Sequence, residues 1–181
     1  EVGVNLSEQI RELYAGSYRR MVVQLYAITG DLGEAQDAVQ EAFTKALIAP
    51  KRLAARDNPE AWVRRVAVNL ARNRWRRRRT LNRLLRGREL RPRDVPGASP
   101  DHVALVDAMR QLPEGQRVVI ALHYIGDLPI TEIAVTVGVS EGTVKSRLSR
   151  GRAALAAALD EHVDELPASP ALQLRQEISH A

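Results

Sequence analysis

The sequence lacks cysteine altogether, which excludes disulfides, thiol chemistry and cysteine-ligated zinc. It also lacks an apolar run near the roughly 20 residues that a membrane span needs, and no signal peptide is visible. Aromatic residues make up only 4% of the chain, whereas alanine, leucine, valine and arginine are abundant, which favours helices. We therefore expect a cytoplasmic, all-α protein of 181 residues with one domain or two small ones.

Signatures of catalysis are missing as well. There is no phosphate-binding glycine loop, no HExxH, no calcium loop and no nucleophile elbow. The four histidines are scattered, at positions 102, 123, 162 and 180. Asp37 and Glu41 have a spacing that could bind a cation, but solvated or partner-facing carboxylates are far commoner. We predict no catalytic residue, no metal and no cofactor, and a protein that is not an enzyme.

Positive charge dominates the middle of the chain. Lysine and arginine outnumber aspartate and glutamate by 27 to 22 overall, which indicates a polyanionic partner. From Arg64 to Arg93 there are thirteen arginines and one acid, Glu89. Such a run can be a solvated basic tail. This one starts on a helix with an apolar face and includes Trp75, which we expect to be exposed. Cations beside a stacking surface favour opened or single-stranded DNA.

Helical spacing of apolar residues predicts three helical segments in the N-terminal half. The first, about 6–28, is either one long helix or two short ones, and Asp31 is placed to cap the second segment, about 33–48. A loop over 49–59 ends at a proline, and the third helix follows over 60–79. We expect it to bury Trp62, Val63, Val66, Ala67 and Leu70. Its outward face is expected to hold Arg64, Arg65, Val68, Arg72, Trp75, Arg76 and Arg79.

The helix over 33–48 is unusual in a basic protein because its outer face is acidic. The face comprises Glu34, Gln36, Asp37, Gln40 and Glu41. DNA would repel these carboxylates. The face is therefore either a solvated surface or a docking face for a basic protein partner.

The C-terminal half begins after a stretch with glycine, proline and many arginines. This stretch, 80–100, has no lasting apolar period and indicates a basic linker. Apolar spacing then predicts helices over 101–112 and 114–125. The tail over 160–181 is polar and acidic, and the sequence leaves open whether it is disordered or carries a short docking helix.

The stretch Leu128–Arg152 predicts a helix-turn-helix. Gly138 supplies the turn because a residue without a β-carbon takes a left-handed conformation at no steric cost. Ser140 is a good N-cap for the second helix. That helix turns Val144, Leu148 and Leu155 toward the core. Its other side presents small residues, hydroxyls and cations, which suit the phosphates and base edges of a DNA major groove.

Three motifs resemble bacterial RNA polymerase sigma factors of the extracytoplasmic-function (ECF) group in the sigma-70 family. The first is DLGEAQDAVQEAF, 31–43, similar to the region 2 signature D-x-x-x-A-E-D-x-x-Q-E-x-F. The second is PEAWVRRVAVNLARNRWRRRR, 59–79, similar to the segment that opens and reads the −10 element. The third is LPEGQRVVIALHYIGDLPITEIAVTVGVSEGTVKSRLSRGR, 112–152, similar to region 4, which reads the −35 element.

Two of the positions that depart from the family pattern bear on these expectations. Asn73 stands where the family has aspartate, and Pro129 stands where the family commonly has serine. We therefore expect Pro129 to be the first residue of its helix, with Asp127 near the cap.

The resemblance implies two small helical domains and their partners. Region 2 would cover 6–79, a basic flexible linker 80–100, region 4 101–159 and a polar acidic tail 160–181. The expected partners are promoter DNA and the β′ and β subunits of core RNA polymerase. The implied core-binding residues are Asp37, Gln40 and Glu41. The implied −10 contacts are Arg64, Arg65, Asn69, Arg72, Asn73 and Arg76, beside a loop that captures a flipped base. The implied −35 contacts are Ser140, Thr143, Lys145, Ser146, Arg147 and Arg150.

The residues alone also allow two other classes of protein. A dimeric helix-turn-helix regulator with an N-terminal sensing domain explains 128–152 equally well, but it does not explain an acidic helix next to a basic one with a tryptophan. A nucleic-acid-processing enzyme is weaker because catalytic residues are missing. The sequence does not reveal the promoters, the controlling signal or whether an anti-sigma factor exists.

Overall fold

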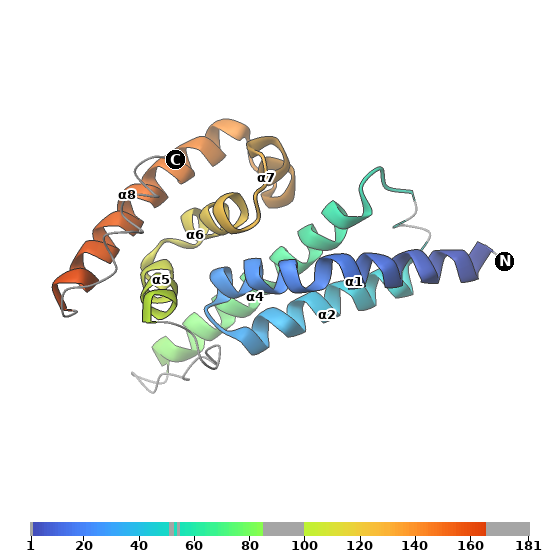
Figure 1. The fold of residues 1–181 in the computed structure, drawn as a ribbon, viewed down its shortest axis with the longest axis horizontal. Coiled ribbons are helices and arrows are strands. Elements are labelled where there is room, and N and C mark those ends of the chain that lie inside the picture. Colours follow the sequence, from blue (N-terminus) through green and yellow to red (C-terminus); the bar gives the residue numbers. More distant parts are fainter. Residues whose placement is uncertain (1, 51–52, 54, 85–99, 166–181) are drawn as a thin grey trace.

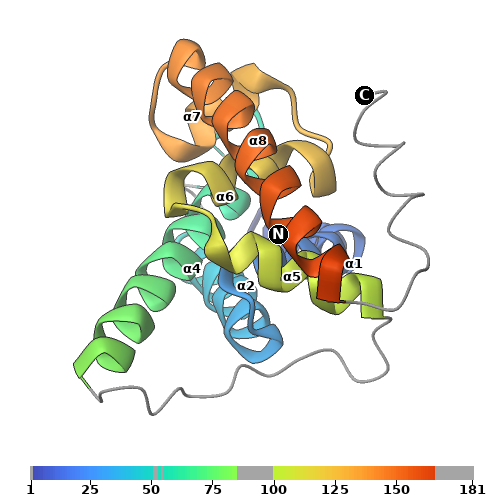
Figure 2. The ribbon, with the colours of Figure 1, turned by 90° about the vertical axis from the view of Figure 1, so that its left-hand side faces the viewer.

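The computed structural model consists of two groups of packed helices (Figures 1 and 2). It describes the backbone of residues 2–50, 53, 55–84 and 100–165, and the side chains of 8–50, 53, 55–81 and 104–159. The first group comprises α1 (Val2–Thr29), α2 (Leu32–Ile48) and α4 (Pro59–Leu84). The second comprises α5 (Pro100–Gln111), α6 (Glu114–Ile120), the π-helix η1 (Ala121–Ile125), α7 (Ile130–Val137) and α8 (Glu141–Glu165). Within these residues there is no strand, and no helix is long and apolar enough to cross a membrane.

The turn between α1 and α2 forms as its residues predict. Gly30 has φ +66°, a left-handed conformation that ends α1 at little cost. The Asp31 side chain then accepts a hydrogen bond of 3.0 Å from the backbone N–H of Glu34, which confirms the predicted cap. At the start of α4, the Asn58 side chain accepts one of 2.9 Å from the N–H of Ala61. The first predicted segment is one continuous helix.

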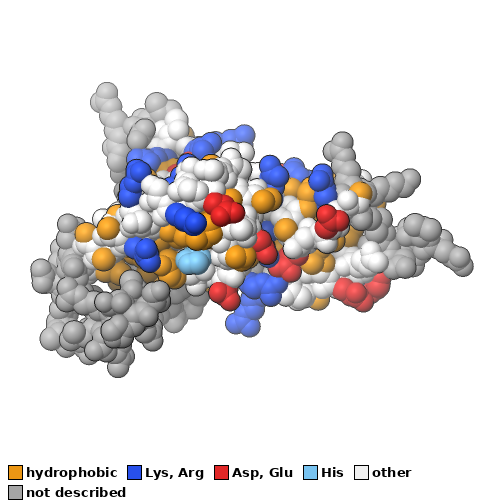
Figure 3. All heavy atoms as spheres, turned by 90° about the horizontal axis from the view of Figure 1, so that it is seen from above, with side chains coloured by type: hydrophobic (Ala, Val, Ile, Leu, Met, Phe, Trp, Pro, Cys, Tyr) orange, Lys and Arg blue, Asp and Glu red, His pale blue; other side chains and the backbone are white. Residues whose placement is uncertain are grey.

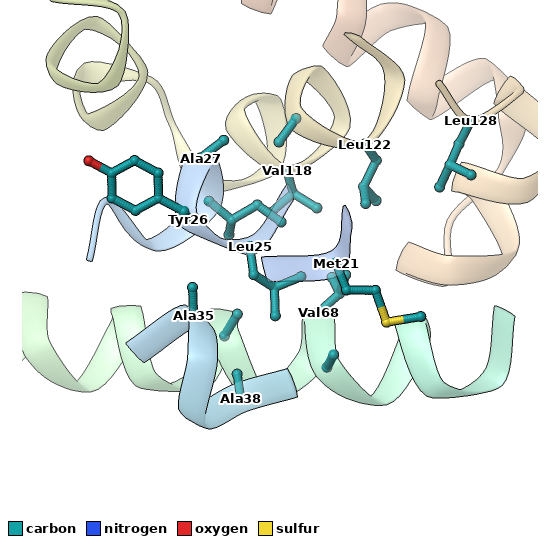
Figure 4. Close-up of a cluster of buried hydrophobic side chains, with 14 of the residues drawn as sticks. Met21, Leu25, Tyr26, Ala27, Ala35, Ala38, Val68, Val118, Leu122 and Leu128 are labelled. Atoms are coloured by element: carbon teal, nitrogen blue, oxygen red, sulfur yellow. The ribbon is translucent and has the colours of Figure 1, made fainter. Parts of the chain in front are cut away.

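Two positions on α4 are buried instead of facing outward as predicted. Arg64 is 6% exposed, and Val68 is fully buried. Figure 4 shows Val68 in the same cluster as Met21 and Leu25 of α1. The reason is that α4 contacts α1 and α2 and also α7, so it has two covered sides instead of one. An amphipathic pattern with one solvent face was the wrong expectation for this helix.

The helix-turn-helix is formed by α7 and α8. Gly138 has φ +75°, and the Ser140 hydroxyl accepts a hydrogen bond of 3.3 Å from the N–H of Thr143, so the predicted turn and cap are confirmed. Pro129 is the N-cap residue of α7, and not its first helical residue as expected. Asp127 has φ +51° and makes no side-chain cap to this helix.

The predicted helix over 114–125 is divided, because its second part winds as a π-helix. The N–H of Gly126 bonds the carbonyl of Ala121 at 3.0 Å, five residues earlier. A β-carbon on Gly126 would lie 2.5 Å from the carbonyl oxygen of Leu122, so only glycine fits there. Both α4 and α8 run past their predicted ends, while 85–99 and 166–181 lie outside the described residues.

The two groups of helices share one hydrophobic core. α1 contacts α2 and α4 on one side and α5, α6 and η1 on the other. Figure 4 shows Met21 and Leu25 of α1 beside Val118 of α6, Leu122 of η1 and Leu128. All five side chains are at most 7% exposed. The structure is therefore a closed arrangement, in which the second group of helices is packed directly on the first.

Candidate nucleic-acid interface

The outer face of α8 is open to solvent, although its inner face is anchored. Val144 and Leu148 are buried, and Gly151 lets α8 lie close to α6, because a β-carbon there would come within 2.9 Å of the Ile120 side chain. Of the predicted −35 residues, Ser140, Lys145 and Arg150 are exposed, whereas Thr143, Ser146 and Arg147 are half-buried. Figure 3, which looks down on α7 and α8, shows lysine and arginine side chains exposed on this surface.

Internal hydrogen bonds order this face. The hydroxyls of Ser140 and Thr143 are 2.9 Å apart, and Arg150 donates to the Ser146 hydroxyl at 2.8 Å. No described carboxylate is ion-paired to Lys145, Arg147 or Arg150, so these cations keep their charge uncompensated. Such a face can meet phosphates and base edges without first breaking an ion pair.

The predicted −10 face on α4 is divided into free and paired residues. Arg65, Asn69 and Asn73 are exposed. Arg72 and Arg76, in contrast, both bind the carboxylate of Glu114 at the start of α6, with nitrogen–oxygen distances of 2.6 Å from Arg72 and 2.7 and 2.9 Å from Arg76. Two neighbouring cations of one helix group therefore share a single carboxylate of the other, which offsets only part of their positive charge.

Arg64 is paired in a similar way. It donates to Glu60 of its own helix at 2.6 Å and to Glu132 in the first turn of α7 at 3.3 Å. Its side chain is 7% exposed. A cleft of about 400 Å³ lies beside it, and its walls include Asn58 and Trp62 from the first group and Val135 from α7. The resemblance assigns a flipped base to the loop over 50–58, and residues 56–58 of that loop line this cleft together with residues of α7.

These contacts shift the pKa values of both kinds of group. Burial by itself would raise the pKa of Glu114, but hydrogen bonds from Arg76 and Arg72 outweigh it, and the pKa is lowered. The same bond raises the pKa of Arg76. The pKa of Glu60 is likewise lowered, because hydrogen bonds from Arg20 and Arg64 outweigh the effect of burial. All of these groups are charged at neutral pH.

Trp75 is half-buried, not exposed as the sequence predicted. The guanidinium of Arg117, on α6, lies 4.1 Å from the centre of its ring, and that of Arg79 lies 5.2 Å away. Arg117 is 1% exposed, and this burial, together with the nearby cations Arg79, Arg78 and Arg110, lowers its pKa to about 10. The stacking surface expected for DNA is therefore covered by a cation from the other helix group.

The acidic face of α2 remains accessible. Asp37 and Gln40 are exposed, and Glu41 is half-buried. Lys45 lies 2.8 Å from Glu41, and this hydrogen bond is the main reason that the pKa of Glu41 is lowered. Arg74 of α4 lies 2.9 Å from Glu41 and 3.9 Å from Asp37. The face is thus held in place by α4 and still presents carboxylates to a partner.

Sequence reasoning missed the structural role of two arginines on α4. Arg74 and Arg78 continue the buried stripe of Ala67 and Ala71 at helical spacing, so the periodicity contained the signal. Arg78 lies 3.2 Å from both Asp31 and Glu34, and it also donates to the carbonyl of Thr29. These two cations connect α4 to α2.

Comparisons with known proteins agree with this arrangement. The chain matches the models for sigma-70 region 2 over residues 13–80 and sigma-70 region 4 over residues 102–155. It is 30% identical over 154 residues to the ECF RNA polymerase sigma factor SigW of Bacillus subtilis, covering 76% of this chain and 82% of that protein. It is 36% identical over 129 residues to the RNA polymerase sigma-E factor of Streptomyces antibioticus, covering 67% and 68%.

Solved structures show the same fold. The sigma factor RpoE of Bartonella quintana, in complex with the anti-sigma factor NepR, matches with a TM-score of 0.68 at 20% identity over 84% of this chain and 98% of that one. CnrH, in complex with the cytosolic domain of CnrY, matches with a TM-score of 0.63 at 26% identity over 86% and 90%.

A helix-turn-helix joined in one chain to an acidic helix and a basic helix defines a promoter-specificity protein of the transcription machinery. Both family models match in the expected order, and the chain is 30% identical to SigW over 82% of that protein. The chain belongs to the sigma-70 family of RNA polymerase sigma factors, within the ECF group. The family resemblance read from the three motifs is confirmed, and the dimeric regulator is not favoured.

Proposed function

We propose that this sigma factor acts through three surfaces, one each on α8, α4 and α2. Region 2 covers 6–79, region 4 covers 101–159, and the linker connects them in the sequence. It is a cytoplasmic specificity subunit with no catalysis of its own. The observation that carries the proposal is that one chain has both an open basic face on α8 and an exposed acidic face on α2. A sigma factor needs both surfaces, because one holds the polymerase while the other reads DNA.

The face of α8 reads duplex DNA at the −35 element through Ser140, Thr143, Lys145, Ser146, Arg147 and Arg150. Small residues beside them let the backbone come close to the groove. Lysine and arginine anchor phosphates or reach guanine, and each good bidentate pair is worth about 1–3 kcal/mol.

The outer side of α4 holds the melted −10 strand through Arg64, Arg65, Asn69, Arg72, Asn73 and Arg76. Cations fix the phosphates of a single strand, and an aromatic ring offers its bases a stacking surface. Trp75 lies on the same helix, and the guanidinium of Arg79 is 5.2 Å from the centre of its ring.

The acidic face of α2, with Asp37, Gln40 and Glu41, docks on core RNA polymerase. Because the polymerase then fixes the separation of the two DNA-reading regions, two weak sites act together through effective concentration. We add an anti-sigma factor to the proposed partners, since the sigma factor RpoE is bound to one in its solved structure.

The test is transcription by core RNA polymerase with the purified chain on genomic DNA fragments. We expect a stable complex with the core and transcripts that start at defined promoters, which share −35 and −10 sequences. Absence of core binding, with dimers in solution and a palindromic footprint, would instead support the dimeric regulator.

A further inference from the structure

One cation of the α8 face, Arg147, lies on a glycine of the neighbouring helix. A β-carbon built on Gly115, in the first turn of α6, would lie 3.1 Å from both the Cζ and the Nε atoms of Arg147 and 3.4 Å from its Nη1 atom. These three distances differ little, so the planar face of the guanidinium lies over the α-carbon of Gly115. Carbon atoms prefer separations of about 3.5–4.0 Å, so any side chain at position 115 would push the guanidinium away.

The close packing of α8 on α6 brings Arg147 to this glycine. One turn farther along α8, Gly151 is buried, and a β-carbon there would lie 2.9 Å from the side chain of Ile120 and 3.3 Å from that of Gln116. Two glycines, one on each helix, therefore lie where α6 and α8 meet. Gly151 lets the helices approach, and Gly115 leaves room for the side chain of Arg147 on the first turn of α6.

Arg147 lies at the flank of the DNA-facing side of α8 and not at its centre. The side toward the core is defined by four buried positions, Val144, Leu148, Gly151 and Leu155. At about 100° per residue, Arg147 lies about 70° from that direction, whereas Arg150 lies about 130° and Ser146 about 170° from it. A helix in a major groove turns its centre toward the base edges, and its flanks lie nearer to the phosphate backbones.

The guanidinium of Arg147 keeps its charge and its N–H groups for a partner. No described carboxylate is ion-paired to it. Glu114, which precedes Gly115 in the chain, accepts hydrogen bonds from Arg72 and Arg76 of α4. The contact with Gly115 covers a face of the guanidinium, while its N–H groups point outward in its plane, where phosphate oxygens can accept them. A side chain already held in place also loses less entropy on binding.

We propose that Gly115 is a positioning residue for −35 recognition: it holds the guanidinium of Arg147 where it binds a backbone phosphate at the edge of the major groove, and not a base. Ser146 and Arg150, nearer the centre of the face, then read the bases. This inference rests on the proposed −35 role of α8. It assigns different tasks to the two arginines of that face.

The test compares the full-length wild-type chain with Arg147→Ala, Gly115→Ala, Gly115→Leu and the double variant Gly115→Leu/Arg147→Ala. Gly16→Leu is the matched glycine control, because a β-carbon there has nothing within 4 Å. Arg19→Ala, at an exposed position of α1, controls for the lost charge. Each protein is titrated at several salt concentrations into two fluorescein-labelled duplexes of unrelated sequence, each of about 30 base pairs, or roughly three helical turns.

We expect Arg147→Ala to weaken binding to both duplexes equally, by roughly fivefold at low salt, and to flatten the slope of log affinity against log salt by about 0.9, the value for one phosphate. Gly115→Leu should have the same effect, and Gly115→Ala a smaller one. In the Arg147→Ala background, Gly115→Leu should cause no further loss. Both replacements favour a helix more than glycine does, so thermal unfolding of the Gly115 variants should come no earlier than that of the wild type.

Three results would overturn the proposal in different ways. Additive losses from Gly115→Leu and Arg147→Ala, or wild-type affinity of Gly115→Leu, would remove the positioning role of Gly115. A loss on one duplex only, with an unchanged salt slope, would make Arg147 a base-reading residue. If Arg147→Ala bound both duplexes as tightly as Arg19→Ala, the proposed −35 role of Arg147 itself would fail, and this failure differs from that of the positioning role.

Discussion

The two surfaces proposed to bind DNA use the same kinds of side chain but differ in what surrounds them. On α8, Lys145 and Arg150 are exposed and have no acidic partner among the described residues. On α4, Arg72 and Arg76 share the carboxylate of Glu114. The comparison teaches that a basic residue in a sequence motif indicates a possible DNA contact, while its tertiary environment decides whether the contact is available.

The largest effect is expected at the acidic face of α2, because both proposed DNA-binding surfaces act only when this face holds the polymerase. Asp37→Lys/Glu41→Lys should weaken binding to core polymerase about a hundredfold or more, since like charges replace attractive ones at the docking face. Binding is measured by fluorescence anisotropy with labelled sigma factor. The control Glu8→Lys/Glu12→Lys makes the same change of charge on α1. If both variants bound core equally well, the acidic face of α2 would have no docking role.

The open surface is tested by Lys145→Ala/Arg147→Ala. We expect a large loss of transcription, and the slope of log affinity for duplex DNA against log salt should flatten by about 1 for each phosphate that is no longer neutralised. Arg11→Ala/Arg19→Ala, at exposed positions of α1, controls for net charge. Readout by α8 would be excluded if the wild type transcribed equally from natural promoters and promoters with a scrambled −35 element.

The contact between the two groups of helices can be strengthened as well as weakened. Gln24 on α1 is fully buried against Gly126, and neither polar atom of its side chain has a hydrogen-bond partner among the described residues. Gln24→Met keeps the side-chain length and removes both atoms, so the closed form should gain roughly 1 kcal/mol. Affinity for single-stranded DNA should then fall about fivefold, while duplex binding by α8 is unchanged. Gln36→Met, on the exposed side of α2, is the matched control. Tighter single-strand binding by Gln24→Met would contradict this assignment of the interface.

The smallest expected effect is a pH dependence of closure. The pKa of Glu114 in the closed form is below its ordinary value of 4.5, because the bonds from Arg76 and Arg72 outweigh burial. The stabilisation is therefore fully present above the ordinary pKa and is lost as pH falls through the closed-form pKa. The two regions should therefore separate on acidification below about pH 4.5. Energy transfer between dyes on cysteines introduced at the exposed positions of Gln36 and Ala156 should then fall. Glu114→Gln should show a smaller fall over the same range, and an equal one would mean that other carboxylates control it.

Local features of the fold could be predicted because short segments determine them. Asp31 and Ser140 cap the helices that follow them, and Gly138 makes the turn of the helix-turn-helix. Caps and turns depend on residues within a few positions, so a single sequence contains the information. The proposed −35 residues on α8 benefit from the same property, because one helical face follows from its spacing alone.

The pairing of α4 with region 4 could not be predicted in this way. Glu114 lies 38 positions from Arg76, and nothing in the pattern around either residue indicates the other. Val68 was assigned to the outer face because only one covered side was expected for α4. Arg74 is a different case, since the continued stripe on α4 would have placed it against α2. The unpredicted part is thus the contact between regions that are far apart in the chain.

The apolar contact between the two regions also has a thermal consequence. Opening brings Met21, Leu25, Val118, Leu122 and Leu128 into contact with water, so its heat-capacity change is positive. Hydrophobic association of this kind weakens on cooling. The closed form should therefore lose population toward low temperature, and the arginines of α4 would be released by cold without any other signal. The apolar contact would thus make the availability of these arginines depend on temperature.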